Sequence, residues 1–194
     1  METAQWALTI AGLSLLVSAG SLTWQIVTWF RQSARIRVEL RWGGVSDDWQ
    51  HWIVAEEKAN VVDALAQVDP IEYPIPAAIV IVRNRGRSAM SIQDACVEFP
   101  EGYTYRHRDI NLYAGLPGPL QDGGVLSVPV PIAHVFEAWT RGNSQTTTIR
   151  GLAFLGNGKT CTSEPLTISR SDQPVIEQRF GKDAERQSDA GDDA

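Results

Sequence analysis

The sequence has little of what catalytic and metal-binding sites are usually built from. Its 194 residues include two cysteines and three histidines. Cys96 and Cys161 form no C-x-x-C, and His51, His107 and His134 form no H-x-H or H-E-x-x-H, so metal-ligand spacing is absent. No G-x-S-x-G nucleophile motif is present either. The residues therefore predict no catalytic residue, no metal site and no cofactor.

A phosphate-binding loop is suggested by only one stretch, "FLGNGKT", in which Gly158-Lys159-Thr160 matches the end of a P-loop. That loop needs G-x-x-x-x-G-K-[ST] followed by a helix. The first glycine position is Ala153, and the following "CTSEPLTIS" is typical of a strand. Asn157-Gly158 is the signature of a type I′ hairpin turn, so we expect a hairpin here rather than a nucleotide site.

The chain also lacks an excess of basic residues. Its formal net charge is −6, which argues against nucleic acid as a partner. Hydrophobic residues make up 43% of the chain and charged residues 21%, a balance typical of a folded protein.

Charge is absent altogether from Thr3 to Phe30. A helix from Trp6 to Phe30 is about 37 Å long, more than the roughly 30 Å of a bilayer core. Trp6 at one end and Trp24 and Trp29 at the other suit the two membrane interfaces. Residues 1–32 are therefore predicted to be a transmembrane anchor that contacts the bilayer through residues 6–30. A buried core helix and a cleaved signal peptide are alternatives, disfavoured by the length of the run and the absence of Lys and Arg before it.

Positive charge follows the anchor immediately, at Arg31, Arg35, Arg37 and Arg41. Because cytoplasmic flanks carry the excess of Lys and Arg, we expect a single-pass protein of the plasma (inner) membrane. Its N-terminus would face out and its main domain would face the cytoplasm. Arg31 and Arg35, with the three tryptophans, are the expected membrane-interface residues. The pairs Ala7/Ala11 and Ser14/Ser18 would permit a weak homodimer through the anchor.

Residues 33–172 are typical of an all-β domain, an immunoglobulin-like antiparallel sandwich. "RIRVELRW" alternates as a half-buried strand does, and "AAIVIVRN" reads as a strand buried on both faces. Further strands are expected in "AMSIQDACVEFP", irregularly in "YTYRHRDINLY", and in "VLSVPV", "SQTTTIRGLAFL" and "KTCTSEPLTIS". Pro129 indicates that Val125–Val130 is an edge strand, and Pro131 opens a short helix, "IAHVFEAWTR".

Two segments stand apart from this strand pattern. Residues 43–76 are predicted to be a partly helical insertion, with Ser46 as an N-cap and a second apolar stretch from Val61 to Val68. Residues 173–194 are polar and acidic without apolar periodicity, and are predicted to be a disordered tail.

Tryptophan is concentrated again at Trp42, Trp49 and Trp52. This cluster is either an exposed patch near the membrane, for lipid or for a protein partner, or part of the core. The burial of large aromatic residues on average favours the core.

The stretches "SLTWQIVTWFRQSARIRVELRWG" and "AIVIVRNRGRSAMSIQDACVEFP" resemble a group of uncharacterised single-pass proteins of actinobacteria. Those proteins pair an N-terminal anchor with an immunoglobulin-like domain, and the strand–"NxG"–strand element is here "VRNRGRSAMSI". The resemblance covers about half of the chain and implies a fold and an anchor. It implies no catalytic residue.

The expected function is a membrane-anchored protein-interaction module, not an enzyme, with an unknown protein partner captured at a loop or a sheet edge. One alternative is an extracytoplasmic, envelope-binding domain with a Cys96–Cys161 disulfide; in the cytoplasm both thiols should be free. Another is an enzyme whose site lies near His107 and His134 and needs Asp109 or Asp122 beside them.

Overall fold

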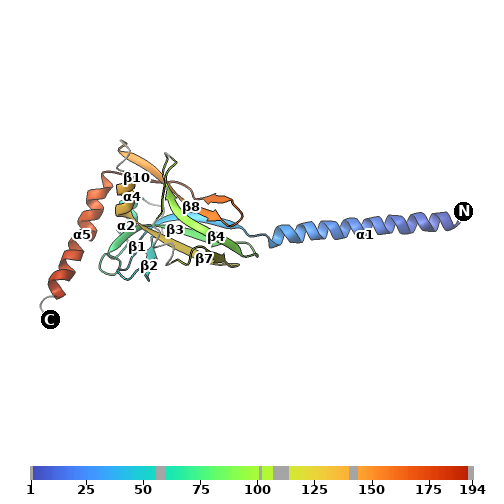
Figure 1. The fold of residues 1–194 in the computed structure, drawn as a ribbon, viewed down its shortest axis with the longest axis horizontal. Coiled ribbons are helices and arrows are strands. Elements are labelled where there is room, and N and C mark those ends of the chain that lie inside the picture. The colour runs from blue at the N-terminus through green and yellow to red at the C-terminus, as the bar shows by residue number, and fades with distance from the viewer. Residues whose placement is uncertain (1, 56–59, 101, 107–113, 140–143, 192–194) are drawn as a thin grey trace.

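A computed structural model describes residues 2–55, 60–100, 102–106, 114–139 and 144–191 of the chain, with the side chains of 5–29, 33–55, 60–100, 102–106, 114–139 and 144–181. The described part is mostly β-structure arranged as two antiparallel sheets. A long helix leaves the domain at one end, and another helix covers the opposite end (Figure 1).

The helices are α1 (Glu2–Gln32), α2 (Val61–Leu65), α4 (Ile132–Trp139) and α5 (Asp172–Gly191). The strands are β1 (Ile36–Val45), β2 (Trp52–Val54), β3 (Ile75–Asn84), β4 (Met90–Glu98), β5 (Thr104–Tyr105), β6 (Gly118–Leu120), β7 (Val125–Pro131), β8 (Thr146–Leu155), β9 (Thr160–Thr162) and β10 (Leu166–Ser169).

Helix α1 is long and apolar enough to cross a membrane between Gln5 and Trp29, and its most apolar 18-residue window is 0% buried. The domain therefore does not bury this helix, and the alternative of a core helix is wrong. Three hydroxyls along it, on Thr9, Ser18 and Thr23, each donate to the carbonyl oxygen four residues earlier at 2.8 Å. Such back-bonding satisfies the hydroxyl within its own helix, which lowers the cost of placing it in an apolar medium.

The first sheet has the order β2-β1-β3-β7 and the second the order β10-β8-β4-β5, with β6 on β4 and β9 on β8. β3 lies in the middle of the first sheet, where its register with β1 runs from Asn84 opposite Ile36 to Ile75 opposite Val45. Its inward residues Ala78, Val80 and Val82 and its outward Ala77, Ile79 and Ile81 are all buried. The prediction of a strand buried on both faces is confirmed, and its apolar run follows from that burial.

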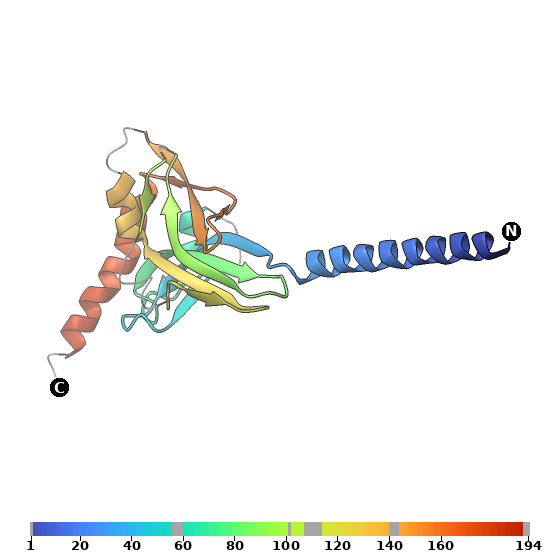
Figure 2. The same ribbon diagram turned by 45° about the vertical axis from the view of Figure 1, so that its right-hand side comes forward.

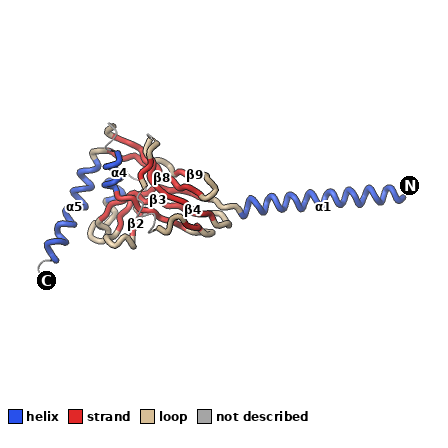
Figure 3. Tube along the Cα trace, viewed as in Figure 1, coloured by secondary structure: helices blue, strands red, loops and turns tan. Residues whose placement is uncertain are grey.

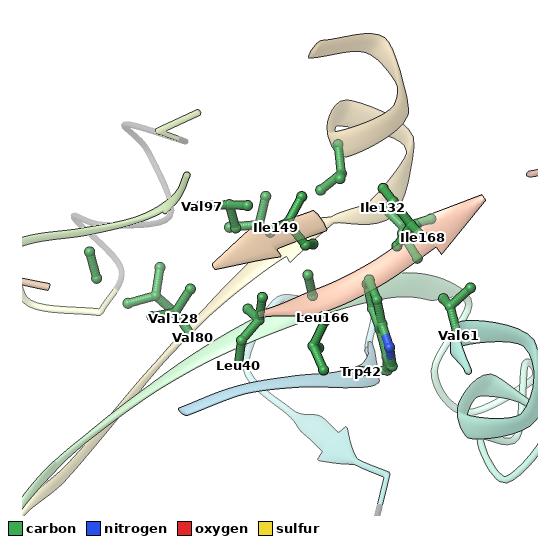
Figure 4. Packing of buried hydrophobic residues seen from close by; sticks show 14 of the residues in the cluster. Leu40, Trp42, Val61, Val80, Val97, Val128, Ile132, Ile149, Leu166 and Ile168 are labelled. Carbon is green, nitrogen blue, oxygen red and sulfur yellow. The ribbon is translucent and has the colours of Figure 1, made fainter. Parts of the chain in front are cut away.

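One hydrophobic core fills the space between the sheets. Alternate residues of β1, β3 and β7 meet those of β4, β8 and β10, as Leu40, Val80, Val128, Val97, Ile149 and Ile168 show (Figure 4). Trp42 lies in this core beside α2, and Ile132 brings α4 against it. The helix expected after Pro131 is confirmed, because Val135, Phe136 and Trp139 form its buried stripe.

The insertion contains less helix than expected. The predicted N-cap at Ser46 is wrong, because Ser46–His51 is a tight connection between β1 and β2. There the hydroxyl of Ser46 accepts from the backbone N–H of His51 at 3.0 Å, and Asp48 accepts from that of Gln50 at 2.9 Å. Short polar side chains that bond to nearby backbone in this way favour a turn over a helix. The second apolar stretch does form a helix, α2, capped by Asn60.

The C-terminal segment also differs from its prediction. Helix α5 occupies Asp172–Gly191, where disorder was expected from residue 173, and it packs beside α4 (Figure 2). Ile176 and Phe180, one helical turn apart, are both buried. Arg179 donates to the carbonyl oxygens of Ala66 and Val68, each at 3.0 Å. These contacts hold the first turns of α5 against the domain.

Candidate functional site

The free edge of β1 is the strongest candidate for a binding site in the described structure. The backbone N–H of Arg85 donates to the carbonyl of Arg35, and that of Ala55 donates to the carbonyl of Trp42. Main-chain groups of an antiparallel strand alternate in direction, so odd-numbered residues of β1 bond to β3 and even-numbered ones face the other side. β2 pairs with β1 from Gly43 to Val45 only. Within the described residues, no strand pairs with Ile36, Val38 or Leu40 on that side.

A groove of about 330 Å³ runs beside this edge. Its other wall is the β9–β10 edge of the second sheet, with Cys161 and Thr162 on β9, Glu164 between the strands and Leu166 on β10. The groove is therefore the open side of the domain, where two strand edges face each other. Its charges are mixed: Glu39 pairs with Arg37 at 3.2 Å and with Arg41 at 3.7 Å.

The edge at β7 was predicted from Pro129, and the structure confirms that β7 is the last strand of its sheet. The N–H of Asn84 donates to Gly124, which fixes the alternation along β7. By that alternation Val125, Ser127, Pro129 and Pro131 direct their backbone outward. Because proline has no N–H, half of this edge cannot donate to an added strand, a common protection of exposed edges. β1 has no such proline.

The two cysteines are free thiols on opposite faces of the second sheet. Ala95 pairs with Ala153, which pairs with Cys161, whereas Cys96 pairs with Leu152. Paired residues share a face and successive residues alternate, so the thiol groups point to opposite sides. They are also two strand spacings of about 4.8 Å apart, beyond the reach of a disulfide. A disulfide within this fold is thus excluded in either compartment, and free thiols do not report on which side of the membrane the domain lies.

Cys96 is deeply shielded on its face. Burial first, and the neighbouring carboxylate of Asp94 second, raise the pKa of its thiol to about 11. Arg106 lies over this region, where its guanidinium pairs with Asp94 at 2.9 Å and stacks 4.9 Å above the ring of Phe154. A protonated thiol that is covered by other side chains is a poor nucleophile. The role of Cys96 is therefore structural.

The three tryptophans of the predicted patch do not form one surface. Trp42 is 1% exposed in the core, and Trp49, with φ of 60°, is half-buried against both hydrophobic clusters. Trp52 alone is open, at 40%, next to the similarly exposed Ile53 on β2. The core interpretation is confirmed for Trp42, and the exposed part of the predicted patch is limited to Trp52 on β2.

Of the residues proposed for an enzyme site, the structure describes His134 and Asp122, and it does not bring these two together. His134 Nδ1 lies 2.7 Å from the hydroxyl of Tyr105, and burial raises the pKa of that tyrosine, with Glu137 as a second cause. Asp122 lies before β7 and His134 follows it, so the seven residues of β7, about 23 Å of extended chain, separate them. His107 and Asp109 lie outside the described residues. Among described residues, no group of three or more His, Cys, Asp and Glu could hold a metal ion.

The "FLGNGKT" stretch is a hairpin tip between β8 and β9, as predicted. Its turn differs from the expected type I′. Gly158, at φ of +79°, is the only described residue of the tip in the left-handed region. Its N–H donates to Leu155, whose own N–H donates to Lys159. This is a three-residue loop with a type I turn and a glycine bulge. Strand β9 and no helix follows it, so this stretch is not a P-loop.

The junction between α1 and the domain is tightly bonded. The side-chain oxygen of Asn84 accepts from the N–H of Gly86 at 3.0 Å and of Arg35 at 3.3 Å. Its amide nitrogen donates to the carbonyls of Ser88 at 2.8 Å and Leu120 at 3.1 Å. A Cβ at Gly86 would collide with the backbone of Ser33 and Arg35, so the "NxG" element clamps the segment leaving the anchor. Sequence reasoning treated this element as a turn and missed its contact with residues 33–35.

No protein-family model matches the chain, and no curated protein sequence matches it. The function therefore has to be inferred from the geometry of the chain itself.

Proposed function

We propose that the protein is a membrane-anchored interaction module that captures an extended segment of a partner protein on the free edge of β1. The observation that carries this proposal is the direction of the main-chain groups of Ile36, Val38 and Leu40. Three N–H and three C=O groups face the groove without a paired strand, and an added strand would satisfy all six.

The groove suits such a segment on chemical grounds. Its floor is the edge of the core, at Val38, Leu40 and Leu166, and its outer rim carries both signs of charge. Alternate side chains of an added strand would meet the apolar floor and the Arg37–Glu39–Arg41 ladder in turn. The blocked edge at β7 makes β1 the better acceptor.

The anchor is part of the same proposal. The unburied α1 supports a single membrane span with Trp6, Trp24 and Trp29 at the interfaces, and the arginines after it support a cytoplasmic domain. Two antiparallel sheets around one core support an immunoglobulin-like sandwich of the kind found in the resembling actinobacterial proteins. Topology is tested by Ala89→Cys with Cys161→Ser, which should react with maleimide only after the membrane is breached. Labelling in intact cells would place the domain outside.

Photocrosslinking at defined positions tests the binding edge. A photoreactive amino acid at Arg37 or at Thr162, on the two walls of the groove, should trap the same partner in cells. Thr148, exposed on the outer face of β8, is the matched control and should not trap it. Val38→Pro removes an outward N–H and should abolish the crosslink from Arg37. A partner trapped equally from Thr148, or unaffected by Val38→Pro, would rule out strand addition at β1.

A further inference from the structure

Four segments distant in the sequence meet at the end of the domain from which α1 leaves. These segments, which we call the anchor-side loops, are residues 33–35, 85–89, 121–124 and 156–159. Gly86 abuts the backbone of residues 33–35, and Asn84 donates to Gly124 at 3.0 Å. Gly156 donates at 2.7 Å to Ser91, close after residues 85–89. Figure 3 shows loops gathered on the side of the domain that faces α1.

These loops are basic, in contrast to the chain as a whole. Arg35, Arg85, Arg87 and Lys159 are exposed on them, and the only acid in these segments is Asp122. No ion pair between described residues involves Arg85, Arg87 or Lys159. Arg83, half-buried on β3, adds a further cation beside them.

A group of five acids lies at the other end of the domain. β1 starts at the anchor-side loops and ends at Val45, and the chain from there to β3 carries Asp47, Asp48, Asp69 and Glu72 in its connections and Asp63 in α2. The ten residues of β1 span about 33 Å, several times the Debye length of about 8 Å. The two ends therefore act as separate fields, one positive towards the anchor and one negative away from it.

The basic end is held close to the membrane surface. Ser33, Ala34 and Arg35 are the whole connection between α1 and β1, and three residues reach at most about 10 Å. The hydrogen bonds of Asn84 fix that connection to residues 85–89 and to Leu120. A domain free to tumble would need a longer and unbonded linker.

We propose that the anchor-side loops bind the anionic lipid headgroups of the bilayer that α1 spans, so that the domain is seated on the membrane and not merely tethered to it. Arg85 and Arg87 on the β3–β4 hairpin are the principal contacts, with Arg35 and Lys159 beside them. Phosphate and headgroup oxygens of anionic lipids match guanidinium and ammonium donors, and their charge is of the required sign. The inference rests on the proposed anchor.

Fluorescence energy transfer from a dye on the β3–β4 hairpin to labelled lipid tests whether the anchor-side loops contact the bilayer. The full chain carrying Ala89→Cys with Cys161→Ser is labelled with a donor dye, while buried Cys96 stays unlabelled. The labelled protein is reconstituted with headgroup-labelled acceptor lipid in phosphatidylcholine vesicles, with or without phosphatidylglycerol. Transfer should be higher with phosphatidylglycerol, and about 0.5 M salt should remove the difference because it shortens the Debye length.

Charge-neutral variants identify the contacts. Arg85→Gln with Arg87→Gln should lower the ratio of seated to unseated protein about 25-fold, about fivefold for each arginine. Arg150→Gln, exposed on β8 away from these loops, is the control and should leave the lipid dependence intact. The salt titration is done with Arg85 and Arg87 both present, so the test does not depend on the double variant folding.

Two failures are distinguishable. Protein that does not float with vesicles would overturn the anchor and this inference with it. Protein that floats but shows equal transfer on both lipids would overturn the lipid seat alone. So would an Arg85→Gln/Arg87→Gln variant that behaves as the labelled protein with both arginines does.

Discussion

Asn84 is a buried side chain whose four hydrogen bonds join the anchor exit, the β3–β4 hairpin and β6. A buried hydrogen bond contributes about 1 kcal/mol net, so Asn84→Ala removes at most about 4 kcal/mol. Water can replace the lost partner at exposed Arg35 and Ser88, but not at the buried Gly86 N–H and Leu120 carbonyl. We therefore expect Asn84→Ala to lower the free energy of unfolding by about 2–4 kcal/mol.

Urea unfolding of the full chain in detergent, followed by tryptophan fluorescence, measures this change, because Trp42 and Trp139 are each 1% exposed in the folded state. The midpoint should fall with little change in slope. Asn157→Ala is the control: it removes one 3.1 Å hydrogen bond in an exposed turn and should change stability by about 0.5 kcal/mol or less.

The Asn84→Asp variant tests the effect of hydrogen bonding separately from that of side-chain volume. Aspartate fills the same volume, yet it opposes the carbonyls of Ser88 and Leu120 with a second acceptor. It should therefore be at least as destabilising as alanine. A loss below about 1 kcal/mol for Asn84→Ala, or an aspartate variant milder than alanine, would refute the role assigned to these bonds.

Four further results are expected. Mass spectrometry after an oxidant pulse should find no Cys96–Cys161 disulfide in folded protein. Because the pKa of Cys96 is raised from 9.0 to about 11, the protonated thiol contributes stability below pH 9, and this contribution is lost as the pH rises to about 11. Urea titrations should show this fall in the free energy of unfolding, and Cys96→Ala should lack it. Val38→Pro removes an outward N–H and Glu39→Pro a ladder donor to β3, so Glu39→Pro should show the lower melting temperature; the reverse order would contradict the assigned strand direction. Phe180→Ala should cost about 3 kcal/mol in urea unfolding because this side chain is 5% exposed, whereas a disordered tail would show no loss.

Patterns that depend on one element were readable from the sequence. The alternation in β1 and the stripe after Pro131 each reflect one buried face, and the apolar run of β3 reflects burial of both faces, so these patterns predicted strands and a helix. The prolines of β7 likewise marked an edge, because a missing donor is a local property.

Features that depend on contacts between distant segments were not readable. Helix α5 is polar apart from a few side chains, and its burial depends on Ile176, Phe180 and the bonds from Arg179 to the end of α2. Arg85 and Arg87 lie some fifty residues after Arg35 in the sequence, and only the register of β1 with β3 brings the three arginines together. The free edge of β1 could not be predicted from the sequence, because it depends on β2 being three residues long and pairing with only the last part of β1.

The short, bonded connection after α1 has a geometric consequence for any association through the anchor. An α-helix turns about 100° per residue, so the face of α1 that carries Ala7, Ala11, Ser14 and Ser18 has a fixed azimuth relative to the β1 groove. Two copies packed on that face would hold their grooves at a defined mutual angle about the membrane normal. One residue inserted within α1 near Gln32 would rotate the grooves by about 100° while leaving each domain intact. The three-residue junction thus sets the rotational phase between α1 and the β1 groove.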